Sequence, residues 1–104
     1  MTELYGLKFI LPSGEAQVFS ELPVSIGRGE QNDLVLEDDT ISSSHAQVYF
    51  DERIHAVCIA DLGSLNGLYL DGQPSLRNVL YDDAKIKLGN IEITFRDTGY
   101  IHPD

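Results

Sequence analysis

The chain has 104 residues, and its 17 Asp and Glu residues against 7 Lys and Arg residues give a formal net charge of −10. A chain of this length closes one hydrophobic core, which favours a single domain over two. The acidic balance argues against binding to nucleic acid or to an anionic membrane surface, because both ligands require a basic patch on the protein.

The single cysteine, Cys58, rules out an intrachain disulfide and indicates a reducing, cytoplasmic setting. Cys58 lies in an alternating run, so we expect it to be buried as a small hydrophobic residue. No window approaches the ~20 apolar residues of a membrane span, and no signal-peptide pattern is found. The spacing of Cys58, His55 and His102 fits no metal site, so neither a metal nor a cofactor is expected.

Nearly every apolar run is short and alternates with period two, which is typical of half-buried strands and not of helices. The expected strands cover residues 4–11, 15–19, 23–26, 34–36, 45–50, 55–60, 68–70, 84–88 and 91–95. Turn signals separate these runs at short intervals. The pattern predicts an all-β fold, an antiparallel β-sandwich whose connecting loops gather at its two ends.

Two segments have a less regular pattern. Asp71-Gly72 is the strongest two-residue hairpin signal in the chain. The following residues, 73–83, show no clear period, and we expect Leu76, Val79 and Leu80 to pack irregularly on the core. The polar residues 97–104 are interpreted as a C-terminal tail, the start of a linker to further domains, after a domain that covers residues 1–96.

Six motifs follow one another in a fixed order: Gly27-Arg28, Asn32-Asp33-Leu34, Ser42-x-x-His45-Ala46, Asp61-x-x-Ser64-x-Asn66-Gly67, Asp71-Gly72 and Leu88-Gly89. Each motif alone is weak, whereas six in order are specific. Together they resemble the forkhead-associated (FHA) domain, whose fold is the SMAD/FHA-type sandwich. The resemblance implies an antiparallel sandwich of about eleven strands that recognises phosphothreonine through loops at one end and has no enzymatic activity.

The resemblance also implies roles for individual residues. Arg28 resembles the arginine that binds the phosphate, and a guanidinium can donate two parallel hydrogen bonds to phosphate oxygens. Ser42 resembles the serine whose hydroxyl donates to the same phosphate. Ser43 stands where the family commonly has Arg or Asn, and we expect it to donate a weaker contact to the phosphate. Asn66 resembles the asparagine that binds the peptide backbone, with Leu65 beside it.

Four further residues are expected to support this site without touching the phosphate. By the same comparison, His45 ties the two recognition loops together, and Gly27 and Gly67 shape them. Ser64 belongs to the same group. Leu65 departs from the family, because many members have Thr there; the loss of that hydroxyl would remove a donor worth roughly 1.5 to 3 kcal/mol to a charged group.

Two other interpretations stay open at this point. The chain is alternatively a scaffold or oligomerisation module that uses the same fold without phosphate, which the departures at Ser43 and Leu65 motivate. A hydrolase built from His45, Ser42, Ser44 and Asp61 is the weaker alternative, since no strained serine turn and no oxyanion loop is found. The expected partner is a phosphothreonine protein or peptide, with a Ser/Thr kinase or its substrate among the candidates.

Overall fold

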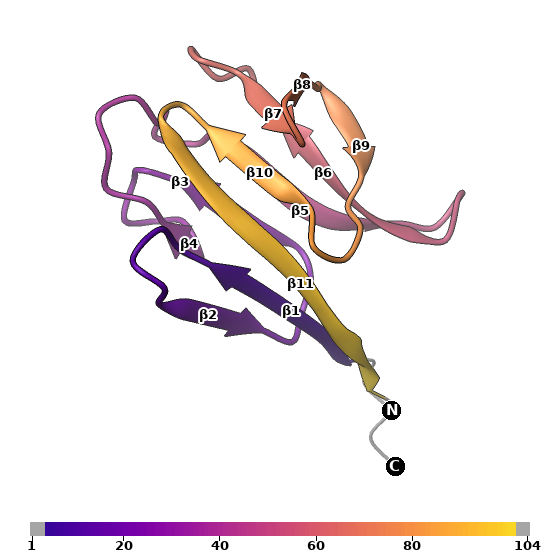
Figure 1. The fold of residues 1–104 in the computed structure, drawn as a ribbon. Coiled ribbons are helices and arrows are strands. Elements are labelled where there is room, and N and C mark those ends of the chain that lie inside the picture. The colour runs from indigo at the N-terminus through magenta and orange to yellow at the C-terminus, as the bar shows by residue number, and fades with distance from the viewer. Residues whose placement is uncertain (1–3, 102–104) are drawn as a thin grey trace.

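The computed structural model describes residues 4–101, which form two β-sheets packed face to face (Figure 1). The eleven strands are β1 (Leu4–Ile10), β2 (Ala16–Phe19), β3 (Val24–Gly27), β4 (Leu34–Val35), β5 (Ala46–Asp51), β6 (Ala56–Asp61), β7 (Leu68–Leu70), β8 (Gln73–Pro74), β9 (Arg77–Val79), β10 (Lys85–Leu88) and β11 (Ile91–Ile101). No helix within the described range is long and apolar enough to cross a membrane. The predicted all-β sandwich of about eleven strands is confirmed.

The six-stranded sheet has the order β2-β1-β11-β10-β7-β8, and all its neighbouring strands are antiparallel. Its longest strand, β11, lies between β1 and β10. The sequence predicts this strand to end at Phe95 and a tail to begin at residue 97, whereas β11 continues to Ile101. The remaining part of the expected tail, residues 102–104, lies outside the described residues.

The extension of β11 depends on close backbone contact with β1. Gly6 is the cross-strand partner of Gly99, and the register shifts between Gly6 and Leu7. A Cβ on Gly6 would lie 2.9 Å from the Gly99 carbonyl oxygen, a backbone atom, so this close approach requires glycine. Polar residues can therefore continue β11 beyond Phe95. The alternation of apolar residues alone does not indicate this extension.

The five-stranded sheet has the order β4-β3-β5-β6-β9. Four of its strands form antiparallel pairs, but β4 runs parallel to β3, with Ile26 opposite Leu34. The expectation of a purely antiparallel sandwich is therefore wrong at this edge. A strand of two residues has too few positions to show a period, so the pattern could not predict its direction.

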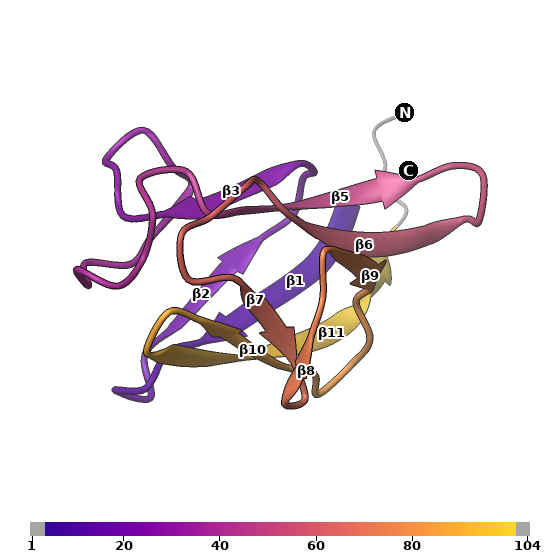
Figure 2. The same ribbon diagram turned by 90° about the horizontal axis from the view of Figure 1, so that it is seen from above.

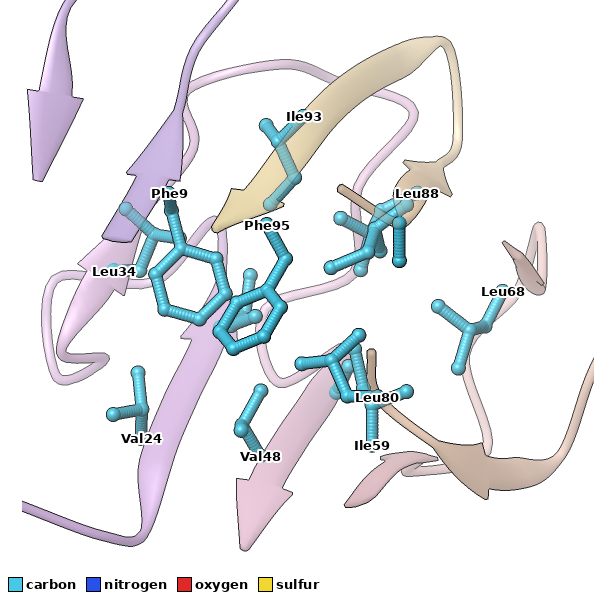
Figure 3. Packing of buried hydrophobic residues seen from close by; sticks show 14 of the residues in the cluster. Phe9, Val24, Leu34, Val48, Ile59, Leu68, Leu80, Leu88, Ile93 and Phe95 are labelled. Atoms are coloured by element: carbon cyan, nitrogen blue, oxygen red, sulfur yellow. The ribbon is translucent and has the colours of Figure 1, made fainter. Parts of the chain in front are cut away.

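The core lies between the two sheets and takes buried side chains from all strands except β2, β8 and β9. Phe9 of β1 and Phe95 of β11 are fully buried in its centre, with ring centroids 5.4 Å apart (Figure 3). Val48 of β5 and Ile59 of β6 approach from the opposite sheet. Cys58, between two core positions of β6, is 2% exposed as expected, and desolvation raises the pKa of its thiol.

Residues 73–83 carry the chain from one sheet to the other. Asp71 and Gly72 both have positive φ angles, 47° and 83°, and turn β7 into β8 of the six-stranded sheet, which confirms the predicted hairpin. The chain then crosses to β9 at the edge of the five-stranded sheet. Only Leu80 joins the core; Leu76 is 81% exposed and Val79 is 38% exposed, so the prediction that both pack on the core is wrong.

Candidate functional site

Three loops gather at one end of the sandwich. We call them the arginine loop (residues 28–33, between β3 and β4), the serine loop (residues 36–45, between β4 and β5) and the asparagine loop (residues 62–67, between β6 and β7). Figure 2 shows the first two at the left of the view, away from the start of β1 and the end of β11. Hydrogen bonds from the Arg28 N–H to the Ser42 carbonyl and from the Leu65 N–H to the Ser42 Oγ bring all three loops together at this end.

Arg28 is the first residue after β3, and the serine loop orients its side chain. Its backbone N–H donates to the Ser42 carbonyl at 3.0 Å, and its Nε donates to the Ile41 carbonyl at 3.0 Å. Arg28 takes part in none of the four ion pairs between residues 4 and 101. Its two terminal nitrogens are therefore held in an exposed position, where they can donate to an anion.

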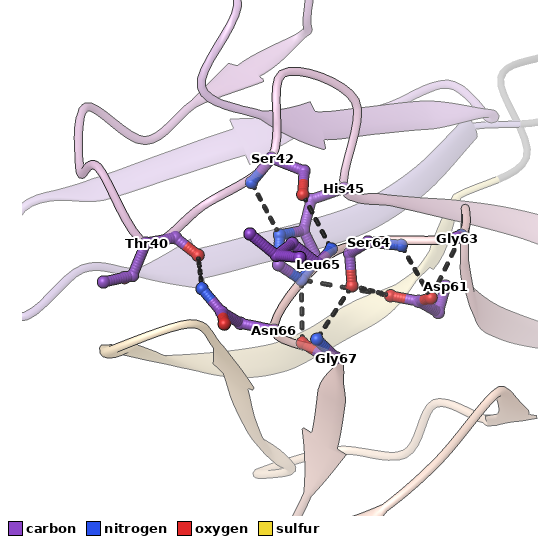
Figure 4. Close-up of polar contacts among 9 residues, drawn as sticks. All are labelled: Thr40, Ser42, His45, Asp61, Gly63, Ser64, Leu65, Asn66 and Gly67. Carbon is purple, nitrogen blue, oxygen red and sulfur yellow. Dashed lines mark hydrogen bonds and ion pairs between the residues drawn. The ribbon is translucent and has the colours of Figure 1, made fainter.

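Ser42 connects the serine loop to the asparagine loop. Its Oγ accepts a hydrogen bond from the Leu65 backbone N–H at 3.0 Å (Figure 4). A hydroxyl that accepts in this way still has its own proton to donate. The Ser42 hydroxyl can therefore donate to a ligand at the same end of the sandwich as the Arg28 guanidinium.

His45 is fully buried, and main-chain groups occupy both of its ring nitrogens. Nδ1 accepts from the Ser42 backbone N–H at 3.1 Å, and Nε2 donates to the Gly67 carbonyl at 2.8 Å. This arrangement requires the neutral tautomer with its proton on Nε2. One imidazole thus spans the serine loop and the asparagine loop.

The asparagine loop closes on itself through one carboxylate and one hydroxyl. Asp61, at the end of β6, accepts from the backbone N–H groups of Gly63 and Ser64, each at 3.0 Å, and from the Ser64 hydroxyl. The Ser64 Oγ in turn accepts from the Gly67 N–H at 3.0 Å. Gly67 has a φ of 83°, a conformation that favours glycine.

Asn66 is exposed at the tip of this loop, and its side chain reaches the serine loop. Its Nδ2 donates to the Thr40 carbonyl at 2.8 Å, which leaves the side-chain carbonyl oxygen and one amide proton for a ligand. The Thr40 hydroxyl accepts from the Asn90 backbone N–H at 2.8 Å. Thr40 thereby joins the serine loop to the asparagine loop and to the turn between β10 and β11.

Thr40 and Asn90 were not among the residues predicted from the sequence. Their contact joins residues 50 positions apart, and neither residue belongs to any of the six motifs. Gly89 gives a clue in retrospect: its φ is 57°, and a Cβ there would lie 2.4 Å from the Thr40 carbonyl oxygen. The need for glycine at position 89 therefore reflects the close contact between the β10–β11 turn and Thr40.

The arginine loop approaches the serine loop through the Ser43 carbonyl. That oxygen accepts from Asn32 Nδ2 at 2.7 Å and from the Gly29 N–H at 3.1 Å. A Cβ on Gly27 would lie 2.3 Å from it, so glycine is required there. The Ser43 hydroxyl is exposed and accepts only a long bond, 3.4 Å, from Gln31 Nε2.

Acidic groups surround this end but leave its donors free. Asp38 accepts hydrogen bonds from the Thr40 hydroxyl and backbone N–H, and these bonds lower the pKa of the Asp38 carboxyl. Glu37 and Asp39 are exposed beside it. The described residues contain no cluster of three or more His, Cys, Asp or Glu side chains able to hold a metal.

The hydrolase alternative requires a serine hydroxyl bonded to a histidine nitrogen. Here the Ser42 backbone N–H, and not its hydroxyl, reaches His45, and the Asp61 carboxylate stands 3.9 Å from Nε2 with its hydrogen bonds going to the asparagine loop. The geometry therefore holds two loops together and presents no nucleophile paired with a base.

Comparisons with known proteins agree with this geometry. The model of the FHA domain family matches residues 24–89. The oxoglutarate dehydrogenase inhibitor of Corynebacterium efficiens is 32% identical over 85 residues, which cover 81% of this chain and 58% of the relative. The glycogen accumulation regulator GarA of Mycobacterium tuberculosis is 29% identical over 83 residues, which cover 80% of this chain and 50% of the relative.

A solved structure extends the similarity to nearly the whole chain. It comes from a structural and functional analysis of phosphothreonine-dependent FHA domain interactions, and it has a TM-score of 0.78 at 30% identity, with 95% of this chain and 99% of that chain covered. The chain spans only about half of the length of its curated relatives. On the family match and this structural agreement, the chain belongs to the FHA domain family.

Proposed function

We propose that the chain is a phosphothreonine-recognition module that binds a phosphorylated segment of a partner protein through the end formed by the three loops. Arg28 and Ser42 hold the phosphate, Ser43 adds a weaker contact, and Asn66 binds the peptide backbone beside Leu65. His45, Ser64, Gly27 and Gly67 keep these groups in position.

The proposal rests on one observation: the protein orients the hydrogen-bond donors at this end but leaves some of their N–H and O–H groups free for a ligand. The Arg28 Nε is bound to the Ile41 carbonyl while its terminal nitrogens are free, and the Ser42 Oγ accepts from Leu65 while its proton is free. Donors that are oriented before the ligand arrives lose little conformational entropy on binding. A phosphate is the ligand that such a guanidinium and hydroxyl pair fits.

The test compares three peptides of the same sequence that carry phosphothreonine, phosphoserine or threonine. We expect the phosphothreonine peptide to bind most tightly, because the γ-methyl group in a small apolar niche is worth about 1 to 3 kcal/mol over phosphoserine. Fluorescence anisotropy measures all three affinities. Equal affinity for the three peptides would exclude phosphate recognition.

Arg28→Ala should weaken phosphothreonine binding by roughly 2 to 5 kcal/mol, because it removes one partner of a charge pair. Arg53→Ala is the matched control. Its side chain is 84% exposed in the β5–β6 turn and stands near Asp51. An equal loss in both variants would mean that Arg28 does not bind the phosphate.

The net charge of the protein indicates which residues should flank the phosphothreonine in a partner. The protein carries a net charge of −10, so a phosphopeptide with basic flanking residues is favoured over an acidic one. The relatives are a dehydrogenase inhibitor and a regulator of glycogen accumulation, and we infer a regulatory role in the cytoplasm for this chain as well. A Ser/Thr kinase or a substrate of one is the expected carrier of the phosphothreonine.

Leu65 motivates a second candidate function, docking of a partner without phosphate. Its side chain is 88% exposed beside Asn66, where many family members have Thr. Under the phosphate hypothesis, Leu65→Thr restores a donor and tightens phosphothreonine binding. Under the alternative, the same substitution weakens partner capture, and capture from a lysate is insensitive both to phosphatase treatment and to Arg28→Ala.

A further inference from the structure

The outward face of the six-stranded sheet collects most of the positive charge of this acidic protein. Four of the seven Lys and Arg residues alternate with core residues on its strands and therefore point away from the core: Lys8 on β1, Lys85 and Lys87 on β10, and Arg96 on β11. This sheet faces the viewer in Figure 1. We call these four residues the basic face.

Acidic residues neutralise the basic face only in part. Arg96 pairs with Asp82 at 3.2 Å, and Lys85 pairs with Asp83 at 3.1 Å, both from the loop before β10. Glu92 stands opposite Lys87 in the register, but no ion pair joins them. Lys87 instead lies over the Tyr69 ring, 6.0 Å from its centroid.

Lys8 has an unfavourable position for the stability of the isolated protein. It is the direct cross-strand partner of Arg96, and no carboxylate within residues 4–101 forms an ion pair with it. Like charges at facing positions of an antiparallel pair are destabilising. A chain with 17 acidic residues still places two cations opposite each other here. Residue pairs that lower the stability of the fold in this way are expected at binding surfaces.

The spacing of the two unpaired lysines suggests the shape of a ligand. Lys8 and Lys87 are separated by two strand spacings and by four residues along β11, which places them about 16 Å apart diagonally across the sheet. An extended peptide covers that distance with about five residues. Lys85 and Arg96 lie on one side of this diagonal, and Glu92 lies on the other side.

We propose that the basic face binds an extended acidic segment of a partner protein, with its carboxylates between Lys8 and Lys87. The charge complementarity of this surface selects an acidic occupant, while the overall net charge of −10 disfavours nonspecific adsorption of polyanions. This surface is separate from the phosphothreonine site, which lies at the loop end.

The experiment uses the full chain labelled with ¹⁵N and titrated with an unphosphorylated hexaglutamate peptide. We expect the amide resonances of β1, β10 and β11 to shift, and the affinity to fall at least tenfold in the double variant Lys8→Glu/Lys87→Glu. The control Arg53→Glu/Arg77→Glu changes the net charge equally but on the other sheet, and it should change the affinity by less than twofold.

Thermal stability provides a second readout, which should increase in a variant whose peptide affinity decreases. Lys8→Glu places a carboxylate opposite Arg96, so Tm should rise by roughly 1 to 4 °C while peptide binding is lost. Arg28→Ala should leave hexaglutamate binding unchanged, and the Lys8/Lys87 variant should keep phosphothreonine binding, so the two sites fail separately.

Several outcomes would overturn the proposal. They are the absence of any shift, shifts confined to the arginine, serine and asparagine loops, and an equal loss in the two charge-reversal variants. Binding to phosphatidylserine vesicles without binding to hexaglutamate would assign the basic face to a membrane and not to an acidic peptide.

Discussion

The serine loop and the asparagine loop use the same local chemistry for different purposes. In each, an aspartate accepts from backbone N–H groups and from a hydroxyl shortly after it in the chain: Asp38 from Thr40, and Asp61 from Ser64. The asparagine loop then closes on itself, because the Ser64 Oγ accepts from Gly67. Thr40 instead makes its further bonds to Asn66 and to Asn90.

This difference separates a hydroxyl that closes its own loop from one that reaches other segments. The asparagine loop has internal bonds through Ser64 and through Asp61, whose side chain is 7% exposed. It also bonds to the serine loop through Leu62, Leu65, Asn66 and Gly67. Substitution of Ser64 should therefore act locally, whereas substitution of His45 or Thr40 should disturb more than one segment.

The largest effect is expected where the two loops share one residue. His45→Ala removes a fully buried ring and leaves the Ser42 N–H and the Gly67 carbonyl without partners, which should cost about 3 to 4 kcal/mol of unfolding free energy. Urea denaturation measures the loss, with the exposed Ser44→Ala as control. A cost below that of typical surface substitutions would show that the loops do not depend on this ring.

A smaller and more local effect is expected for Ser64→Ala. The change leaves the Gly67 N–H without its acceptor and removes one donor to Asp61, at a cost of about 1 to 3 kcal/mol. Amide hydrogen exchange should increase in residues 62–67 while that of residues 36–45 stays unchanged. Increased exchange in both loops would contradict the view that Ser64 acts only within the asparagine loop.

Thr40→Val should have a weaker but wider effect. It removes the acceptor of the Asn90 N–H and the donor to Asp38, at about 0.5 to 1.5 kcal/mol, but keeps the carbonyl that binds Asn66. Amide chemical shifts should change in the serine loop and in the β10–β11 turn together. A change confined to residues next to position 40 would mean that Thr40 does not couple these segments.

The smallest effect is expected from lowering the pH. Hydrogen bonds from Thr40 lower the pKa of Asp38, so the contact stabilises the folded loop above the ordinary carboxyl pKa and is lost only as the pH falls through the lowered value. The Thr40 amide resonance should therefore stay constant from pH 7 to about 4 and move below that. Movement near pH 6 would exclude Asp38 as the titrating group.

The sequence predicted the parts of the fold that have a long enough pattern. Alternation located the strands of the core, and Asp71-Gly72 located the β7–β8 hairpin. It could not predict the direction of β4, which has two residues, or the extension of β11, which depends on the Gly6–Gly99 approach. It also overestimated the burial of Leu76, because an exposed leucine and a buried one look the same in a segment without a period.

In the site, motif spacing brought the right segments together but did not reveal how they are connected. Arg28, Ser42, His45 and Asn66 were predicted as site residues because each has a distinctive neighbour in the sequence. Thr40 and Asn90 act through bonds between distant segments, and Asn32 acts through a 2.7 Å bond to a backbone carbonyl. Such contacts depend on the distance between loops in space, which no local pattern encodes.

The pairing of Leu4 with Ile101 determines how this protein can be handled in an assay. These two residues are direct cross-strand partners. They form the start of β1 and the end of β11, which lie at the end of the sandwich away from the three loops (Figure 1). A tether on either side of the described chain would therefore hold the module on a sensor chip with its recognition end toward the solution. Capture through one terminus and then through the other should give the same peptide affinity, so an orientation artefact can be recognised from a single pair of measurements.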